Sequence, residues 1–443
     1  MRSPLLIAFG WLLLVASVPA QTPPSTPEGA DEVKLVVILT RHGVRTPILH
    51  NEVLDRYSAQ PWPTWEVPPS NLTPHGKRQM VMLGAYYRRI YTAAGVLSGD
   101  SARDLTSVYF RSDSDQRTIE TARDLAAGLV PGAQPEIHAR PLLKPDPLFT
   151  PTKLPVGNPD FALGQAAVLG RLGGDPSNVL RACAPEFSVL RDVLFGPGGA
   201  VPADRVWLLD VPSRMSQGLS DTSASIDHLV DINGGFHRAE QIVDGLMLEY
   251  ADGKPMSEVG WGRMTPAALT QLIRLHSLYF DLTQRTLYPA QVQGSNLASH
   301  LLKTLQQAAG GAPDAGALAP PAAKLLMVVG HDTNIINLTG LLGATWWLPG
   351  TQEDPVLPGG ALVFELRQGR AEAAWRVRTY YVSQTLDQMR AGLPLTPDNP
   401  PYLAPVFIPG CSGDAPGFDA PLPAFEALLQ RVIDPRFVLP ASL

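Results

Sequence analysis

The chain has 443 residues, with 35 lysines and arginines against 41 aspartates and glutamates, which gives a formal net charge of −6 at pH 7. Its length exceeds the size at which a single hydrophobic core usually stops growing, so two domains, or one domain with a large insertion, are expected. An acidic balance argues against a nucleic-acid partner, because nucleic-acid-binding proteins usually carry a basic face.

The first twenty residues combine Arg2 with an apolar stretch from Leu5 to Val18 and with small residues up to Ala20. This pattern is typical of a secretory signal peptide that is cleaved near Ala20. A membrane anchor is the alternative, although the apolar stretch is short for a bilayer span. The pattern predicts a periplasmic or secreted protein that has no membrane partner after cleavage.

The first predicted strand covers 34–39 and leads into segment 41–47, which has the sequence R-H-G-V-R-T-P. The five fixed positions of R-H-G-x-R-x-P would arise by chance in roughly one chain in ten thousand of this length. Ligands of open α/β sheets bind beyond the carboxyl ends of the strands, where this segment would lie. A lone histidine at such a place is more often structural, but the guanidiniums of Arg41 and Arg45 can converge on one anion beside His42.

A helix is predicted over 74–94, because Thr73 is a suitable N-cap and proline is favoured at the first helical position. A second strand, 107–110, leads into segment 111–118, R-S-D-S-D-Q-R-T, and then into a helix that runs through Ala126. Two strand-loop-helix units of this kind indicate an α/β fold with a doubly wound, mainly parallel sheet flanked by helices.

Helical periodicity dominates the middle of the chain, so we predict a mainly helical insertion. The predicted division is a signal peptide at 1–20, a discontinuous α/β domain of 21–155 with 286–443, and a helical domain at 156–285. The stretch 308–323 is rich in Ala, Gly and Pro, which indicates a surface loop or, less favoured, an interdomain linker.

Strand patterns return at 324–329, 361–365 and 376–382, and the first of these strands precedes segment 330–334, G-H-D-T-N. Taken alone, a His-Asp pair before an apolar helix is more often a helix cap than a catalytic pair. Because this pair follows a third strand, as the other polar segments follow theirs, a catalytic pair becomes the favoured interpretation.

Cys183 and Cys411 are the two cysteines of the chain. An oxidising compartment would permit one disulfide bond between them, but two free thiols are equally compatible with the sequence. No spacing of ligand residues suggests a metal site, and we expect no cofactor.

Three predicted strand ends therefore bring together imidazoles, guanidiniums and a carboxylate. Transfer of a phosphoryl group needs a nucleophile, positive donors for the phosphoryl oxygens and an acid for the leaving alcohol. Arginines beside an imidazole disfavour its protonation, so a neutral, reactive fraction persists below neutral pH. The residues concerned are Arg41, His42, Arg45, Arg117, His331 and Asp332.

Segment 41–47 resembles the signature of the histidine acid phosphatases, the larger-domain branch of the histidine phosphatase superfamily. The resemblance implies that His42 attacks phosphorus to form a phosphohistidine, while Arg41 and Arg45 hold the phosphoryl oxygens. It implies no metal, because the guanidiniums supply the positive charge.

The same resemblance extends to the other two strand ends. Segment 113–118 matches a D-x-D-x-R-T pattern of the family, which implies that Arg117 completes the phosphate clamp, with Arg111 as the rival candidate. Segment 330–334 resembles the second signature, which implies that His331 binds phosphate and Asp332 donates the proton.

Further short motifs resemble those of bacterial periplasmic phytases and glucose-1-phosphatases. Asp244 falls where these groups have an acidic pocket residue, and Arg285 where they have a substrate-binding arginine. Alternatively, Asp244 faces solvent on its helix. The motifs lie at 61–65, 72–76, 146–149, 260–263, 347–350 and 358–365.

Two departures bear on the substrate. Residues 48–50, Ile-Leu-His, stand where phytases of this group carry a lysine for further phosphates, whereas Thr333 gives the His-Asp-Thr form seen in phytases. We therefore expect a monomeric, secreted acid phosphatase for small phosphate esters, with inositol phosphates slightly favoured over glucose 1-phosphate or other sugar phosphates. The alternatives are a phosphoglycerate-mutase-like transferase and a non-catalytic phosphate-binding protein.

Overall fold

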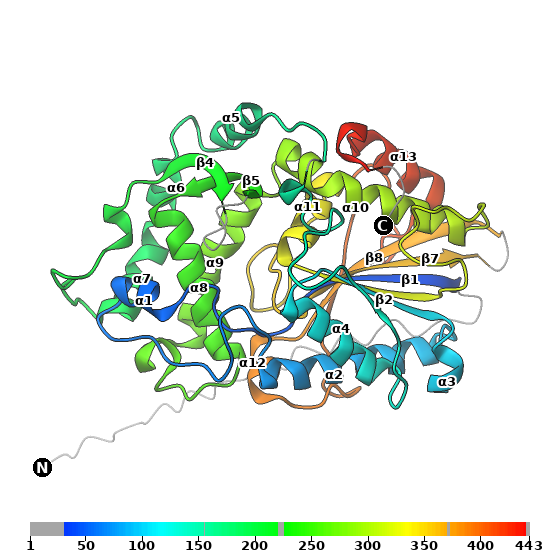
Figure 1. The fold of residues 1–443 in the computed structure, drawn as a ribbon, viewed down its shortest axis with the longest axis horizontal. Coiled ribbons are helices and arrows are strands. Elements are labelled where there is room, and N and C mark those ends of the chain that lie inside the picture. The colour runs from blue at the N-terminus through cyan, green and yellow to red at the C-terminus, as the bar shows by residue number, and fades with distance from the viewer. Residues whose placement is uncertain (1–30, 155, 220–225, 370–372, 440–443) are drawn as a thin grey trace, which may run out of the picture.

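The computed structural model describes residues 31–154, 156–219, 226–369 and 373–439. Within these ranges one eight-stranded sheet carries helices on both faces, and a second group of helices lies beside it (Figure 1). The strands of the sheet are β1 (Glu32–Arg41), β2 (Val108–Ser112), β3 (Ile137–His138), β6 (Leu325–Gly330), β7 (Ala361–Gln368), β8 (Trp375–Ser383), β9 (Tyr402–Pro405) and β10 (Ala420–Pro421).

The sheet has a parallel part and an antiparallel part. Strands β1, β6, β2 and β3 pair in parallel in that order, and β7, β8, β9 and β10 add antiparallel pairs on the other side of β1. The α/β class is confirmed, but the sheet is mixed where a mainly parallel one was expected. Strand β7 ends at Gln368 and β8 begins at Trp375, and so short a connection joins antiparallel strands.

Both faces of β1 are buried, which explains its continuous apolar sequence. Leu35 and Val37 point into one hydrophobic cluster, whereas Val36 and Ile38 point into another on the opposite face. The first face is covered by α10 (Leu287–Ala308), α11 (Asp332–Leu342) and α13 (Leu422–Val432), and the second by α2 (Pro74–Ala93) and α4 (Gln116–Leu129) (Figure 1).

Helix α2 packs tightly against its neighbours. Thr73 caps it as predicted, because its hydroxyl accepts a hydrogen bond from the Gly76 amide at 2.9 Å. A Cβ at Gly76 would clash with the carbonyl of Val44, and one at Gly84 with the carbonyl of Leu125 on α4. The start of α2 therefore supports the loop that follows β1.

A third hydrophobic cluster joins the helices between β3 and α10. We propose that these helices form the inserted domain at 156–285, beside the α/β domain of 21–155 and 286–443. The insertion also contains a hairpin that was not predicted, β4 (Arg214–Leu219) and β5 (Ile226–Asn233). Its helices are α5 (Phe161–Arg171), α6 (Ser177–Ala182), α7 (Ala184–Phe195), α8 (Gly235–Ala251) and α9 (Pro266–Thr283).

The remaining elements are short. The stretch after α10, residues 309–324, has neither helix nor strand, as a surface loop requires. The short elements are α1 (Asn51–Leu54), α3 (Ser101–Asp104), α12 (Leu386–Ala391) and the 3₁₀ turns η1 (Asp55–Tyr57), η2 (Pro151–Lys153), η3 (Leu208–Asp210), η4 (Val259–Gly262) and η5 (Pro435–Phe437).

Cys183 and Cys411 are both buried free thiols, so the alternative of a disulfide bond does not hold. The predicted signal peptide lies outside the described residues. Among the helices that the structure does describe, none has the length and apolar character needed to cross a bilayer.

Candidate active site

The loop after β1 is fixed to the ends of two neighbouring strands. The backbone amide of His42 donates to the carbonyl of Gly330 at 3.0 Å, and the amide of Gly359 donates to the carbonyl of His42 at 2.9 Å. Next in the chain, the Gly43 amide donates to the hydroxyl of Thr121 on α4 at 3.0 Å. These bonds hold His42 at the carboxyl end of the sheet, where sequence predicted it.

The imidazole of His42 lies in the pocket wall and is only 2% exposed. Its Nδ1 lies 2.9 Å from the carbonyl of Gly43, and a proton donated there leaves the lone pair on Nε2. Burial and the guanidiniums of Arg117, Arg45 and Arg41 hold the pKa of His42 well below its ordinary value. The side chain is therefore neutral, as a nucleophile must be, in mildly acidic solution.

Asp244 of α8 joins the two arginines that flank this histidine. One of its carboxylate oxygens lies 3.0 Å from Nη2 of Arg41, and the other lies 2.9 Å from Nη2 of Arg45. Burial opposes ionisation of this carboxyl, but Arg45 and Arg41 more than compensate and keep its pKa far below the ordinary value. Asp244 is 6% exposed, so the alternative of a solvent-facing helix position is wrong.

The two arginines occupy different layers. Arg41 is fully buried behind the pocket wall, where its Nη1 donates to the carbonyl of Val356 at 2.6 Å and its Nη2 lies 3.1 Å from Asp332. Arg45 and Arg117 line the pocket itself. The Nε atoms of Arg45 and Arg117 are buried without a hydrogen-bond partner in the described part of the chain, so the oxygens of an anion could accept from them.

His331 and Asp332 begin helix α11 at the end of β6. The Nε2 atom of His331 lies 2.7 Å from Asp113, and its ring centroid lies 5.6 Å from that of His42. His331 is the N-cap residue, and its amide donates to Asn334 at 2.8 Å. The positive end of the α11 dipole therefore lies beside the two imidazoles, which favours a bound anion.

Asp332 is ionised in the free protein. Burial opposes its ionisation, but the positive charges of Arg41 and His276 outweigh burial and lower the pKa. A phosphate anion beside this carboxylate would counteract those cations and raise the pKa again. Anion binding is thus coupled to proton uptake by Asp332.

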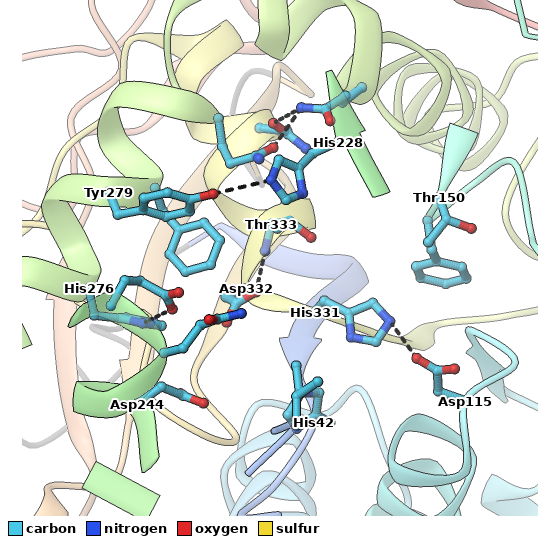
Figure 2. A pocket seen from close by; sticks show the side chains of 18 of the residues that line it. His42, Asp115, Thr150, His228, Asp244, His276, Tyr279, His331, Asp332 and Thr333 are labelled. Carbon is cyan, nitrogen blue, oxygen red and sulfur yellow. Dashed lines mark hydrogen bonds and ion pairs between the residues drawn. The ribbon is translucent and has the colours of Figure 1, made fainter. Parts of the chain in front are cut away.

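The opposite wall of the pocket comes from the helical region (Figure 2). His276 of α9 hydrogen-bonds to Glu240 through Nδ1 at 2.8 Å. Burial lowers the pKa of His276, but the carboxylate of Glu240 outweighs burial, so the net pKa is raised and the imidazole is readily protonated. These residues escaped sequence analysis because no local motif marks them. They include His228, His237, Glu240, Gln241, His276, Tyr279, Gln284 and Gln293.

A further missed part of the wall is the segment 150–153, of which Thr150 lies above Asp115 in the view of Figure 2. It directly follows the D-P-L-F motif at 146–149, where the amide of Leu148 donates to Asp146 at 2.9 Å and Phe149 also lines the pocket. That motif was the available sequence signal for these residues.

Two arginines considered from sequence lie elsewhere. Arg285 pairs with Asp354 and with the carbonyl of Ala344, and it lines a shallow surface pocket rather than this one. The preceding residue, Gln284, lines the active-site pocket instead, so the chain turns the side chain of Arg285 away from it. The structure therefore does not bring Arg285 to the site.

Arg111, the rival of Arg117, also lies apart from the pocket lining. Its Nη2 atom is 3.3 Å from Asp146, whereas Arg117 lies in the wall with its Nη2 atom 2.6 Å from Asp115 and 3.5 Å from Nδ1 of His331.

Ligand atoms of Asp113, Asp115 and His331 lie within 4.8 Å of one another, so this set could hold a metal ion. The Arg117 guanidinium already pairs with Asp115, and His331 already pairs with Asp113. The absence of a metal requirement stays a prediction, which the chelator experiment below tests.

The pocket combines a neutral imidazole, two guanidiniums, a helix N-terminus and a carboxyl whose proton affinity rises with a bound anion. This arrangement suits phosphoryl transfer. In agreement, the family described as "Histidine phosphatase superfamily (branch 2)" matches residues 32–157 and 226–383, more than half of the chain. The chain belongs to this branch of the histidine phosphatase superfamily.

Relatives of this histidine phosphatase cover nearly its whole length. It is 34% identical to Phytase AppA of Escherichia coli over 88% of this chain and 90% of the relative, and 28% identical to a glucose-1-phosphatase of Providencia rettgeri over 90% and 92%. The solved structure of Hafnia alvei phytase with tartrate has a TM-score of 0.83 and 32% identity, covering 95% of this chain and all of the other. This histidine phosphatase is accordingly a phosphoric monoester hydrolase.

Replacement of Arg117 by Gln removes a cation that faces His42, so we expect the pKa of His42 to rise towards its ordinary value of about 6.5. NMR titration of the ligand-free imidazole would measure this rise, and the acid limb of kcat/KM should move to higher pH. Arg123→Gln is the matched control, because Arg123 is exposed on the same helix. An unchanged His42 titration in Arg117→Gln would contradict the electrostatic argument.

Proposed function

We propose that this phosphatase works at acidic pH through a phosphohistidine on His42, and that it acts on inositol phosphates. The phosphohistidine mechanism is supported by the buried imidazole of His42, which stays neutral beside two guanidiniums that face the pocket. A neutral imidazole is a good nucleophile, and the guanidiniums stabilise the charge on the phosphoryl oxygens.

In the proposed reaction, Nε2 of His42 attacks phosphorus while the bond between phosphorus and the ester oxygen breaks. Asp332 gives its proton to that oxygen, and the alcohol leaves. Water then attacks the phosphohistidine, Asp332 takes a proton from the water, and phosphate and free His42 result. Arg45, Arg117 and His331 contact the phosphoryl oxygens in this scheme.

Arg41 has a positioning role in the proposal, because it is buried behind the wall. It holds Asp332 directly and Arg45 through Asp244. The incoming phosphate raises the pKa of Asp332, so the substrate itself helps to load the catalytic acid. Low pH supplies the proton.

Inositol phosphates are favoured as substrates by the relatives and by the opposite wall. The relatives named above include two phytases, and a Hafnia alvei phytase structure with myo-inositol hexakis sulphate also matches at a TM-score of 0.80. His276 adds positive charge to the wall at acidic pH. Ile48 and Leu49 line the pocket without adding charge, which keeps glucose 1-phosphate or other sugar phosphates as the alternative.

The signal-like residues 1–20 support a periplasmic or secreted location, and we propose that the protein acts there as a monomer. The two alternatives from sequence, a mutase-like transferase and a pure phosphate binder, have less support. Family membership favours hydrolysis, and a binder would gain affinity from losing the carboxylate of Asp332.

Replacement of His42 by Ala should lower turnover of p-nitrophenyl phosphate at about pH 5 by at least roughly 10³-fold, because the nucleophile is lost. Rapid quenching of the wild type with labelled substrate should trap acid-labile phosphate on His42. His50→Ala is the control, since His50 is exposed nearby. Retained turnover in His42→Ala, or loss of wild-type activity to chelator, would refute the mechanism.

Asp332→Asn should lower kcat for glycerol 2-phosphate by about 10²–10⁴-fold, because its alkoxide leaving group needs a proton. The loss for p-nitrophenyl phosphate should be much smaller, since the phenolate leaves without one. Steady-state kinetics on both esters measures the difference. Equal losses would show that Asp332 is not the proton donor.

A panel of kcat/KM values should rank phytate above glucose 1-phosphate at acidic pH. Ile48→Lys should raise kcat/KM for phytate and leave glucose 1-phosphate little changed, because it adds a cation at a half-exposed pocket position. Ile48→Met is the matched neutral control. Preference of the wild type for glucose 1-phosphate would overturn the substrate proposal but not the mechanism.

A further inference from the structure

A second cavity lies between helices of the inserted region and segments that border the sheet. It is bounded by α8 and α9 on one side and by β9, α12 and the loop before β7 on the other, and none of its lining residues lines the active-site pocket. Helix α12 lies beside the lower end of α8 (Figure 1). The motif at 347–350, which the active site does not use, contributes three residues to this wall: Leu348, Pro349 and Gly350.

The cavity contains an amide group with nothing to bind. Gln384 is 2% exposed and lines the cavity, yet neither its oxygen nor its nitrogen has a hydrogen-bond partner among the described residues. Among the buried amide side chains in that part of the chain, it is the one that lacks partners for both its donor and its acceptor. The Oε1 atom of Gln352, in the same wall, is also buried and unpartnered.

These groups define the chemistry of an occupant. Two carbonyl oxygens seek donors and one NH₂ group seeks an acceptor, so an anion, which offers acceptors alone, would be repelled. The wall includes no lysine, arginine or histidine, and its acidic residue Asp387 already accepts from the hydroxyl of Tyr250. Hydroxyl groups, which both donate and accept, satisfy all three requirements.

The rest of the wall is largely apolar, with Leu269, Ile273, Leu357 and Leu386, and it includes the side chain of Tyr402. Such a surface packs more favourably against the C–H face of a saturated ring than against water, because water in the cavity would leave the apolar side chains hydrated. A ring with hydroxyl groups on one edge therefore matches both parts of the wall.

We propose that this cavity binds a small neutral polyhydroxylated ring, of the class of cyclitols and hexoses, with its hydroxyl groups on the amides of Gln384 and Gln352. The class includes the alcohols that a phosphatase of sugar or inositol phosphates releases. The inference depends on the cavity's own residues and holds whichever ester is hydrolysed.

A ligand in this cavity can affect the catalytic centre through the segment that contains Val356 and Leu357. Leu357 lines the cavity, and the carbonyl of its neighbour Val356 accepts the hydrogen bond from Arg41 at 2.6 Å. A ligand that fixes this segment acts on Arg41 without entering the active-site pocket. The expected effect on p-nitrophenyl phosphate hydrolysis is a change in kcat at constant KM.

Isothermal titration of the full-length protein with myo-inositol and, separately, with D-glucose tests the proposal and distinguishes the two sources. At least one should bind in the millimolar range, and saturation of the active site with inorganic phosphate should leave that binding unchanged. Gln384→Leu should weaken binding at least tenfold while activity without the ring compound stays within twofold of wild type. Gln306→Leu, a half-buried glutamine on α10, is the control.

Gln352→Leu provides a second variant from a loop position, for use if Gln384→Leu does not fold, and it should also weaken binding. The proposal is overturned if neither compound binds across the millimolar range, if phosphate competes with the binding, or if a folded variant of either glutamine binds as wild type does. Failure of His42→Ala to lose activity would instead refute the phosphohistidine mechanism and leave this cavity unaffected.

Discussion

The active site depends on one carboxylate that bridges two guanidiniums. Asp244 comes from the helical region, whereas Arg41 and Arg45 flank His42 at the end of the central strand, and the bridge joins the two regions across the pocket. Without this negative charge the two buried cations would repel each other, and Arg45 would lose the ion pair that directs its Nη2 atom. With it, Arg45 faces the pocket and Arg41 is directed to Asp332.

The same charges set opposite proton affinities on neighbouring groups. Burial and three guanidiniums keep His42 neutral, while Arg41 and His276 keep Asp332 ionised until an anion arrives. In the proposed mechanism the nucleophile is therefore neutral before the substrate binds, and the acid gains its proton when the substrate binds. The order follows from where the arginines lie, and it needs no movement of the backbone.

Sequence predicted those parts of the site that lie in short continuous segments directly after a strand, because parallel strands bring their carboxyl ends to one edge of the sheet. His42, Arg117 and His331 meet for that reason. The prediction failed for Arg285, because the direction of a side chain at a helix junction depends on packing, here on Asp354. The wall with His228 and His276 was missed because it assembles residues from β5 and α9 that share no local pattern. The strands at 361–365 and 376–382 were predicted, but their antiparallel direction was not, because a strand pattern alone does not give the direction of pairing. The β4–β5 hairpin was missed because it lies in a stretch where helical periodicity dominates.

The position of β1 in the sheet has a consequence for how the chain reaches this structure. Strand β1 pairs on one side with β6, where Val36 lies opposite Leu325, and on the other side with β7, where Thr40 lies opposite Ala361. Strand β1 therefore has no partner in the sheet until the chain has been made as far as β6, which begins more than 280 residues after β1 ends. Such long-range pairing makes folding slow, since loop closure precedes the stabilising contacts. His42, which follows β1 directly, therefore acquires its surroundings only after these distant strands have been synthesised.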